Sequence, residues 1–142
     1  MTNNEEQTMT PEEQTNEARY LGYDAGLSQA TGSVLSELGA RAIIAGDDDV
    51  WSDMLVPNLS GEWSGDPVPN DIARECGLDP YDENDSDAIN EACDTWEEYA
   101  SRGFRDALTA MAYRLVGPFD TALQLEARYE AKAARYRRAT LR

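Results

Sequence analysis

The sequence contains no histidine, one lysine, two cysteines and no apolar run long enough to cross a membrane. Without histidine, the chain lacks the base of Ser-His-Asp and Cys-His nucleophiles and the Glu-x-x-His motif of di-iron bundles. Neither phosphate-binding glycine motif, GxxxxGK[ST] or GxGxxG, occurs in it. We therefore expect a protein that is not an enzyme and that uses no cofactor.

The two cysteines, Cys76 and Cys93, are too few for a disulfide framework and have no CxxC spacing. We interpret them as small buried hydrophobic residues in a reducing compartment. The N-terminus also lacks the basic and then apolar pattern of a secretion signal. These features predict a cytoplasmic protein.

The charge of the chain is strongly negative and unevenly distributed. It has 28 acidic and 12 basic residues among 142, a formal net charge of −16. Residues 1–98 carry a net charge of −21, whereas residues 99–142 carry +5. A surface this acidic repels nucleic acid and anionic membranes and attracts basic protein surfaces.

The segment 87–116 has the clearest helical pattern, with apolar residues recurring at steps of three and four. They are Ile89, Ala92, Cys93, Trp96, Ala100, Phe104, Ala107, Leu108, Met111 and Leu115. This spacing predicts one long helix with a stripe that faces the core.

The segment 10–45 is predicted to be the second main core element. Thr10, Pro11 and Glu13 are typical of a helix start, with a capping threonine, proline at the first position and a capping box. Its expected stripe consists of Tyr20, Tyr23, Asp24, Leu27, Ala30, Val34, Leu35, Leu38 and Ala42. Whether one helix runs through this region or breaks between residues 31 and 39 stays open.

Small residues four positions apart, Gly22, Gly26 and Ala30, lie on one face of this helix. They would let another helix approach closely. The sequence around Gly22 is echoed around Gly103 as Gly-aromatic-x-x-small-Leu, which a meeting of the two helices at small residues would explain.

The connection between these elements is rich in proline and glycine. Asp47–Asp49 are expected to cap a short helix through Trp51, Met54 and Leu55. The loop from Trp51 to Asn70 follows, with Trp63 either packed on the helices or exposed as a contact residue. Asn70 is expected to cap a short helix that Gly77 closes.

The last segment, from Asp120 onward, is rich in alanine, leucine and arginine and predicts a final helix. Its apolar stripe is thin and consists of Leu123, Ala127 or Arg128, Ala131, Ala134 and Arg138. Its cations are Arg128, Lys132, Arg135, Arg137, Arg138 and Arg142, interleaved with Tyr129 and Tyr136. We expect this helix either to project or to be ordered on contact, and its cations to pair with an acidic surface.

Together these patterns predict an all-α protein, a small bundle of three to five helices. A long loop containing proline, glycine and tryptophan would join the two main core helices. Three segments are expected: a disordered acidic tail over residues 1–9, a helical domain over 10–117 and a basic C-terminal helix over 118–142.

Acidic residues Asp87, Glu91, Asp94 and Glu98 share the face of the central helix opposite its apolar stripe. Four charges over 11 residues occupy roughly 16 Å at a rise of about 1.5 Å per residue. This spacing is close to that of phosphates along one strand of B-DNA, about 3.4 Å. Two interpretations remain, a solvated helix face or a mimic of the phosphate backbone.

The acidic stretch 79–91 does not match a calcium-binding loop, because Asp87 and Cys93 stand where an EF-hand starting at Asp82 needs Gly and Glu. We therefore expect no metal site. The residues expected to bind a partner are Asp47, Asp48, Asp49, Asp82, Glu83, Asp85, Asp87, Glu91, Asp94 and Glu98.

The stretch DSDAINEACDTWEEYASRGFRDALTAM, which begins at Asp85, resembles an acidic helix of phage-encoded DNA-mimic antirestriction and anti-CRISPR proteins. Small size, an all-helical pattern and the lack of histidine add to the resemblance. It implies a stoichiometric inhibitor, acting in the host cytoplasm, that occupies the DNA-binding groove of a restriction or CRISPR complex. Those proteins stay acidic to the C-terminus, whereas this chain ends basic.

The functional hypothesis is therefore a non-catalytic binding protein that presents helix-borne carboxylates to a basic nucleic-acid-binding surface. The alternative is a phage structural or assembly protein, similar to a scaffold, that docks through its basic C-terminal helix. A homodimer through the small-residue helix faces or the basic helix is compatible with either.

Overall fold

A computed structural model describes residues 9–32, 34–46 and 69–140 of the chain. Over these ranges the chain forms five α-helices, one short 3₁₀ helix and no strand. The helices are α2 (Pro11–Thr31), α3 (Glu37–Ile44), α5 (Pro69–Glu75), the 3₁₀ helix η1 (Glu83–Asp85), α6 (Ser86–Val116) and α7 (Phe119–Thr140). The prediction of a small all-α bundle is confirmed.

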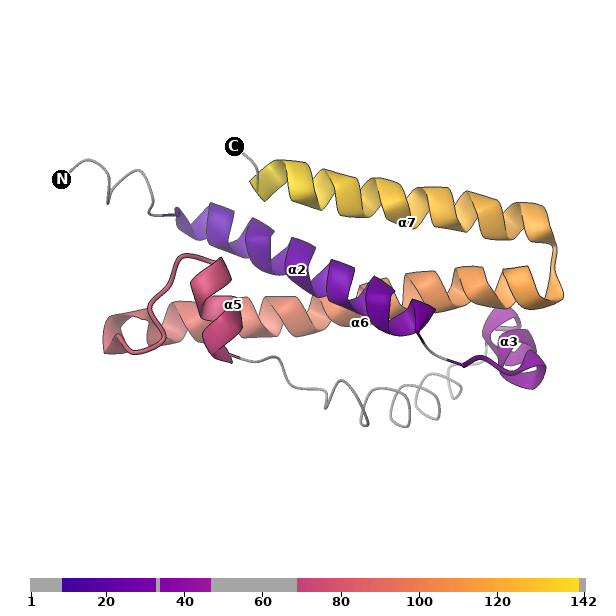
Figure 1. Ribbon diagram of the computed structural model, residues 1–142, viewed down its shortest axis with the longest axis horizontal. Helices are drawn as coiled ribbons and strands as arrows, with labels where there is room; N and C mark the ends of the chain where they lie inside the picture. The colour runs from indigo at the N-terminus through magenta and orange to yellow at the C-terminus, as the bar shows by residue number, and fades with distance from the viewer. Residues whose placement is uncertain (1–8, 33, 47–68, 141–142) are drawn as a thin grey trace.

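The long helix α6 is the centre of the bundle (Figure 1). Helix α2 packs along it in parallel, because Gly22 faces Trp96 and Gly26 faces Ala100. Helix α7 returns antiparallel to α6 and contacts both α6 and α2, while α3 and α5 pack against α6 near its two ends (Figure 1). The N-terminal ends of α2 and α6 therefore lie at the same end of the molecule.

Helix α2 begins with the predicted capping box. The backbone N–H of Thr10 donates to the Glu13 carboxylate at 2.8 Å, and the N–H of Glu13 donates to the Thr10 hydroxyl at 3.1 Å. These two bonds satisfy donors that the first turn of a helix leaves without partners.

The segment 10–45 breaks between α2 and α3, at Gly32. Because α3 starts a new helix with Ser36 as its cap, the apolar spacing of α2 does not continue across the break. Val34 and Leu38, which we expected in the same stripe as Leu27 and Ala30, are 89% and 80% exposed. That part of the predicted stripe is wrong.

Glycines allow the backbones of α2 and α6 to meet. A Cβ atom on Gly26 would lie 2.0 Å from the carbonyl oxygen of Ala100, and one on Gly22 would lie 2.3 Å from that of Trp96. A Cβ on Gly103 would lie 2.3 Å from the carbonyl oxygen of Tyr23. The predicted close approach is confirmed, and since α6 occupies the Gly22–Gly26 face, that face is not available to a second copy of the chain.

The core has two clusters along α6. Near its C-terminal half, buried Ala30, Ala40, Ile43, Phe104, Ala107, Leu108 and Ala112 pack together. Near its N-terminal half, buried Ala18, Ile72, Ala73, Cys76, Leu78, Ile89 and Ala92 pack together. The predicted stripe of α6 is confirmed except at its last member, since Leu115 is 52% exposed.

Helix α5 starts at Pro69, so Asn70 lies in its first turn and is not the residue before it, as we expected. Its other end matches the prediction. Gly77 has a φ of +75°, the left-handed conformation that glycine adopts without strain, and the Leu78 N–H donates to the Ala73 carbonyl at 2.7 Å. Leu78 is buried in the adjoining cluster.

Helix α7 packs on the bundle with a face different from the predicted one. The residues turned toward α2 and α6 include Ala122, Leu125, Tyr129, Lys132, Ala133 and Tyr136. The expected stripe is wrong, since Leu123, Ala127, Arg128, Ala131, Ala134 and Arg138 are all exposed. The actual contacts use tyrosine rings and a lysine stem, which a search for aliphatic residues overlooks.

Several predictions fall outside the described residues. They concern the tail before Met9, the Asp47–Asp49 cap, the short helix through Leu55, the packing of Trp63 and the cation at Arg142.

Candidate partner-binding face

The acidic segment before α6 is held by its own carboxylates. The Asp82 side chain accepts from the Asn84 N–H at 2.9 Å, and the Asp85 side chain accepts from the Asp79 N–H at 2.8 Å. Asp79 in turn accepts from the Tyr81 N–H at 2.9 Å. Asp82 and Asp85 therefore shape the chain that leads into α6, while Glu83 is exposed beside them.

The four carboxylates of Asp87, Glu91, Asp94 and Glu98, which we call the acidic ladder, are all exposed on α6. Among the described residues, none of the first three makes a hydrogen bond or ion pair. Glu98 differs, because the Arg102 guanidinium one turn later pairs with it. The ladder therefore offers three carboxylates without a cationic partner in this part of the chain.

A groove lies beside the first two carboxylates of the ladder. It has a volume of about 230 Å³ and runs between the starts of α2 and α6. Its lining includes Asp87, Glu91, Gln14, Thr15 and Pro11. Two carboxylates with an amide and a hydroxyl nearby are acceptors suited to a guanidinium or an ammonium group.

The acidic ladder ends at a cluster of arginine and tyrosine. The Arg102 guanidinium lies 4.5 Å from the centre of the Tyr99 ring, and that of Arg19 lies 5.6 Å from it. Tyr99 packs edge-on against Tyr136 of α7 at 5.5 Å between ring centres. This cluster separates the acidic half of α6 from the part of the bundle that α7 covers.

The basic helix α7 carries Arg128, Arg135, Arg137 and Arg138 on its exposed side. The two tyrosines among them face the other way. Tyr136 packs edge-on against Tyr23 at 5.3 Å, and Tyr129 packs against the core cluster around Phe104. The cations and aromatic rings that alternate in the sequence thus lie on different faces of the helix.

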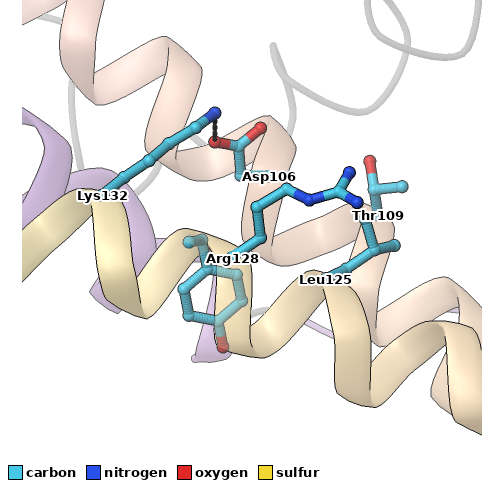
Figure 2. Close-up of a pocket in the computed structure, with 6 residues that line it drawn as sticks. Asp106, Thr109, Leu125, Arg128 and Lys132 are labelled. Carbon is cyan, nitrogen blue, oxygen red and sulfur yellow. Dashed lines mark hydrogen bonds and ion pairs between the residues drawn. The ribbon is translucent and has the colours of Figure 1, made fainter.

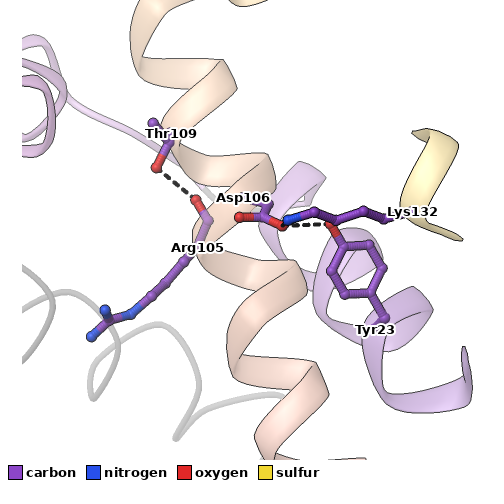
Figure 3. A network of polar contacts seen from close by, with 5 residues as sticks. All are labelled: Tyr23, Arg105, Asp106, Thr109 and Lys132. Atoms are coloured by element: carbon purple, nitrogen blue, oxygen red, sulfur yellow. Dashed lines mark hydrogen bonds and ion pairs between the residues drawn. The ribbon is translucent and has the colours of Figure 1, made fainter. Parts of the chain in front are cut away.

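One carboxylate joins the three main helices (Figure 3). The Oδ2 atom of Asp106 in α6 accepts from the Tyr23 hydroxyl of α2 at 2.5 Å and pairs with the Lys132 ammonium of α7 at 3.2 Å. Burial, together with the hydrogen bond to Asp106, raises the pKa of Tyr23 well above its ordinary value. The tyrosine therefore stays neutral and donates its proton.

Sequence reasoning missed this network, because its members are 83 and 26 residues apart. One signal was present. Asp106 is the only acidic residue between positions 99 and 119, within a helix whose other carboxylates lie in its first half.

A small pocket adjoins the network between α6 and α7 (Figure 2). Its volume is about 90 Å³, and its lining includes Asp106, Thr109, Arg128 and Lys132. The Thr109 hydroxyl already donates to the Arg105 carbonyl at 2.7 Å, and Lys132 is paired with Asp106. The network thus has its protons and charges engaged in holding the helices together.

The two cysteines do not form a reactive centre. Cys76 is buried, its thiol lies 3.5 Å from the Gln14 carbonyl, and burial raises its pKa to about 12. Burial also raises the pKa of Cys93. Since the thiolate is the nucleophilic form, both stay unreactive at neutral pH. Over the described ranges, no three Cys, Asp or Glu side chains converge as a metal site would require.

Within the described part of the chain, none of the helices has the length and apolarity needed to cross a bilayer. Comparison of the chain with protein-family models, with curated proteins and with solved structures finds no match.

Proposed function

We propose that the protein is a non-catalytic binding protein whose acidic ladder docks on a basic nucleic-acid-binding surface. In this proposal it inhibits a host defence complex, of the restriction or CRISPR kind, by occupying the place of DNA. The observation that carries the proposal is the set of exposed carboxylates at Asp87, Glu91 and Asp94, which have no cationic partner among the described residues.

The rigidity of α6 supports the proposal. Carboxylates on a helix that is fixed by backbone contacts, as α6 is by Gly22 and Gly26 of α2, keep their spacing when a partner binds. A ligand held in its bound arrangement loses less conformational entropy on association. The ladder, at about 4–5 Å per charge, can then meet cations arranged along a phosphate track, which repeats at about 3.4 Å per strand.

The groove beside Asp87 and Glu91 supports the choice of a basic partner. It offers acceptors to an inserted arginine or lysine, with Gln14 and Thr15 at its side. Glu83 extends the negative surface toward the start of α6. Asp82 and Asp85 contribute charge too, although each also accepts a backbone hydrogen bond.

The test is the double reversal Glu91→Lys with Asp94→Lys, compared with Asp24→Lys with Glu130→Lys. Both variants change the net charge by +4, and all four side chains are exposed, but the control pair lies on α2 and α7. Purified restriction and CRISPR effector complexes serve as probes in a binding assay with competing duplex DNA. We expect the ladder variant to lose at least tenfold in affinity and the control to keep most of it.

Salt dependence provides the second readout. Binding through these carboxylates should weaken steeply between about 50 and 300 mM NaCl, because exposed charges are screened over that range. Equal inhibition by both double variants, or no binding to either complex at low salt, would contradict the proposal.

An assembly role through α7 is the alternative, and the exposed row of Arg128, Arg135 and Arg138 supports it. Deleting α7 is not a clean test, because Tyr129 and Tyr136 pack on the other helices. Replacing the three arginines with glutamine keeps that packing. Loss of assembly in this variant supports the alternative, whereas intact assembly with lost ladder-dependent inhibition supports the first proposal.

A further inference from the structure

Large apolar side chains are exposed at the end of the molecule where α6 turns into α7. Leu115, Phe119 and Leu123 are 52%, 49% and 45% exposed, and Val34 and Leu38 beside α3 are 89% and 80% exposed. We call these five residues the apolar end. In Figure 1 it is the end at which α3 lies beside the C-terminus of α6 and the start of α7, opposite the start of α6.

The two parts of the apolar end form one surface. A groove of about 260 Å³ is lined by Leu35, Met111, Arg114 and Leu115, which places the segment that holds Val34 against the last turns of α6. On the other side, the Arg114 guanidinium lies 5.1 Å from the centre of the Phe119 ring. Leu123 follows Phe119 by one helical turn.

The charges around this surface are matched within the chain. Arg114 binds the Glu126 carboxylate with two donors, one of them at 2.8 Å, and this bond lowers the pKa of Glu126. Arg41 pairs with Glu37 of α3 at 3.1 Å. The apolar end is therefore close to neutral, in contrast to the acidic half of the molecule.

The exposed area suits a protein interface. From their exposed fractions, these five side chains present on the order of 600 Å², at the upper end of what monomeric proteins expose in one patch. Two such patches placed together would bury roughly 1,200 Å², the lower limit for a specific interface. A contact of that size is expected to be of modest affinity.

Charge repulsion does not oppose a contact between two copies at this end. Glu98, the nearest residue of the acidic ladder, precedes Leu115 by 17 positions, which is about 25 Å of helix. In an end-to-end pair the two ladders would lie roughly 50 Å apart, several times the Debye length of about 8 Å at physiological salt. A side-by-side pair would instead bring two acidic surfaces together.

We propose that the apolar end is a dimer interface occupied by the same surface of a second copy, related by a two-fold axis. Such a contact is self-complementary, so one patch of neutral, apolar character is enough to form it. It uses neither the glycine face of α2, which α6 already covers, nor the cations of α7.

The experiment compares two variants by sedimentation equilibrium at about 5 to 500 µM protein. Leu38→Glu places a charge in the apolar end, and Tyr81→Glu places the same charge on a side chain of equal exposure, 79% against 80%, near the other end. We expect the native protein and Tyr81→Glu to dimerise with micromolar affinity, and Leu38→Glu to lose at least tenfold. Circular dichroism should show that the helix content of all three is equal.

Two further readouts identify the geometry. X-ray scattering of the native dimer should give a maximum dimension close to twice that of the Leu38→Glu monomer. The dimerisation constant should change by less than about threefold between 50 and 500 mM NaCl, because no ladder charge lies at the contact. A native protein that stays monomeric at 500 µM, an unaffected Leu38→Glu dimer, a compact dimer or a steep loss with salt would each overturn the proposal.

Discussion

The glycines at the α2–α6 crossing differ sharply in what a methyl group would meet. At Gly26 it would lie 2.0 Å from a backbone carbonyl of α6, so the two helices would have to separate. At Gly32 the nearest atoms are 3.6 and 3.8 Å away, and φ is −88°. The same chemical change therefore has opposite expected effects at two positions six residues apart.

We predict that Gly26→Ala lowers the free energy of unfolding by about 1–3 kcal/mol or more, as overpacking does in well-packed cores. Gly32→Ala is expected to leave it unchanged or raise it by about 0.4–1 kcal/mol, because alanine restricts the unfolded chain. Urea denaturation of both variants measures the difference. Equal stability of the two would show that the close approach is not needed.

The Tyr23 phenol gives the fold a dependence on alkaline pH. Burial and Asp106 raise its pKa above the unfolded value of about 10, so the neutral form stabilises the native state fully below pH 10. This contribution is lost as the pH rises above 10 toward the folded pKa. We predict that Tyr23→Phe flattens the fall in stability between about pH 9 and 11.

The exposed Tyr81 provides the matched control for this titration. Tyr81→Phe should retain the native pH profile, measured by denaturant unfolding at each pH. If Tyr23→Phe and the native protein lost stability in parallel, the phenol at position 23 would not be the titrating group.

At the scale of elements, α7 is the helix whose orientation the sequence did not predict. Its contact face contains Tyr129 and Tyr136, whereas Leu123 is exposed. We predict that Tyr136→Ala lowers the free energy of unfolding by about 1–3 kcal/mol, since the ring contacts of Tyr23 and Tyr99 are lost. Leu123→Ala should change it by less than about 0.5 kcal/mol.

Both variants can be compared by chemical denaturation with the native protein as the reference. A larger loss from Leu123→Ala than from Tyr136→Ala would restore the face expected from the sequence.

The elements that local chemistry specifies could be predicted from the sequence. The Thr10–Glu13 capping box and the Gly77 closure of α5 depend on residues within a few positions of each other. The core stripe of α6 follows from a regular spacing over many turns. The acidic ladder was likewise placed correctly on the exposed side, because carboxylates opposite an apolar stripe face solvent.

Features that depend on two distant segments could not be predicted in the same way. The rotation of α7 is set by Asp106 and two tyrosines on other helices, and no pattern within residues 119–140 contains that information. The apolar end arises because Gly32 breaks a stripe that the sequence continues. Whether the ladder binds a partner remains a proposal, since its exposure does not identify what binds there.

At the scale of the whole molecule, the net charge of −16 opposes folding through self-repulsion. Added salt screens this repulsion, as the Debye length falls from about 30 Å at 0.01 M to about 8 Å at 0.15 M. We predict that the melting temperature rises between 10 and 150 mM NaCl. Measuring it with Leu38→Glu, at low protein concentration, excludes a contribution from dimerisation.

An uncharged osmolyte at equal osmolarity is the control for this measurement. A melting temperature that falls with NaCl would mean that attractive pairs such as Arg114 with Glu126 outweigh the repulsion.

The parallel arrangement of α2 and α6 determines the order in which the chain assembles. Arg114 and Glu126 are 12 residues apart, so α6 and α7 can join by closing a short loop. Gly22 meets Trp96 from 74 positions away, a closure that costs roughly 1.6 kcal/mol more by the length dependence of loop entropy. Helix α2 should therefore dock last, leave first, and exchange its amide hydrogens ahead of those in the α6–α7 hairpin.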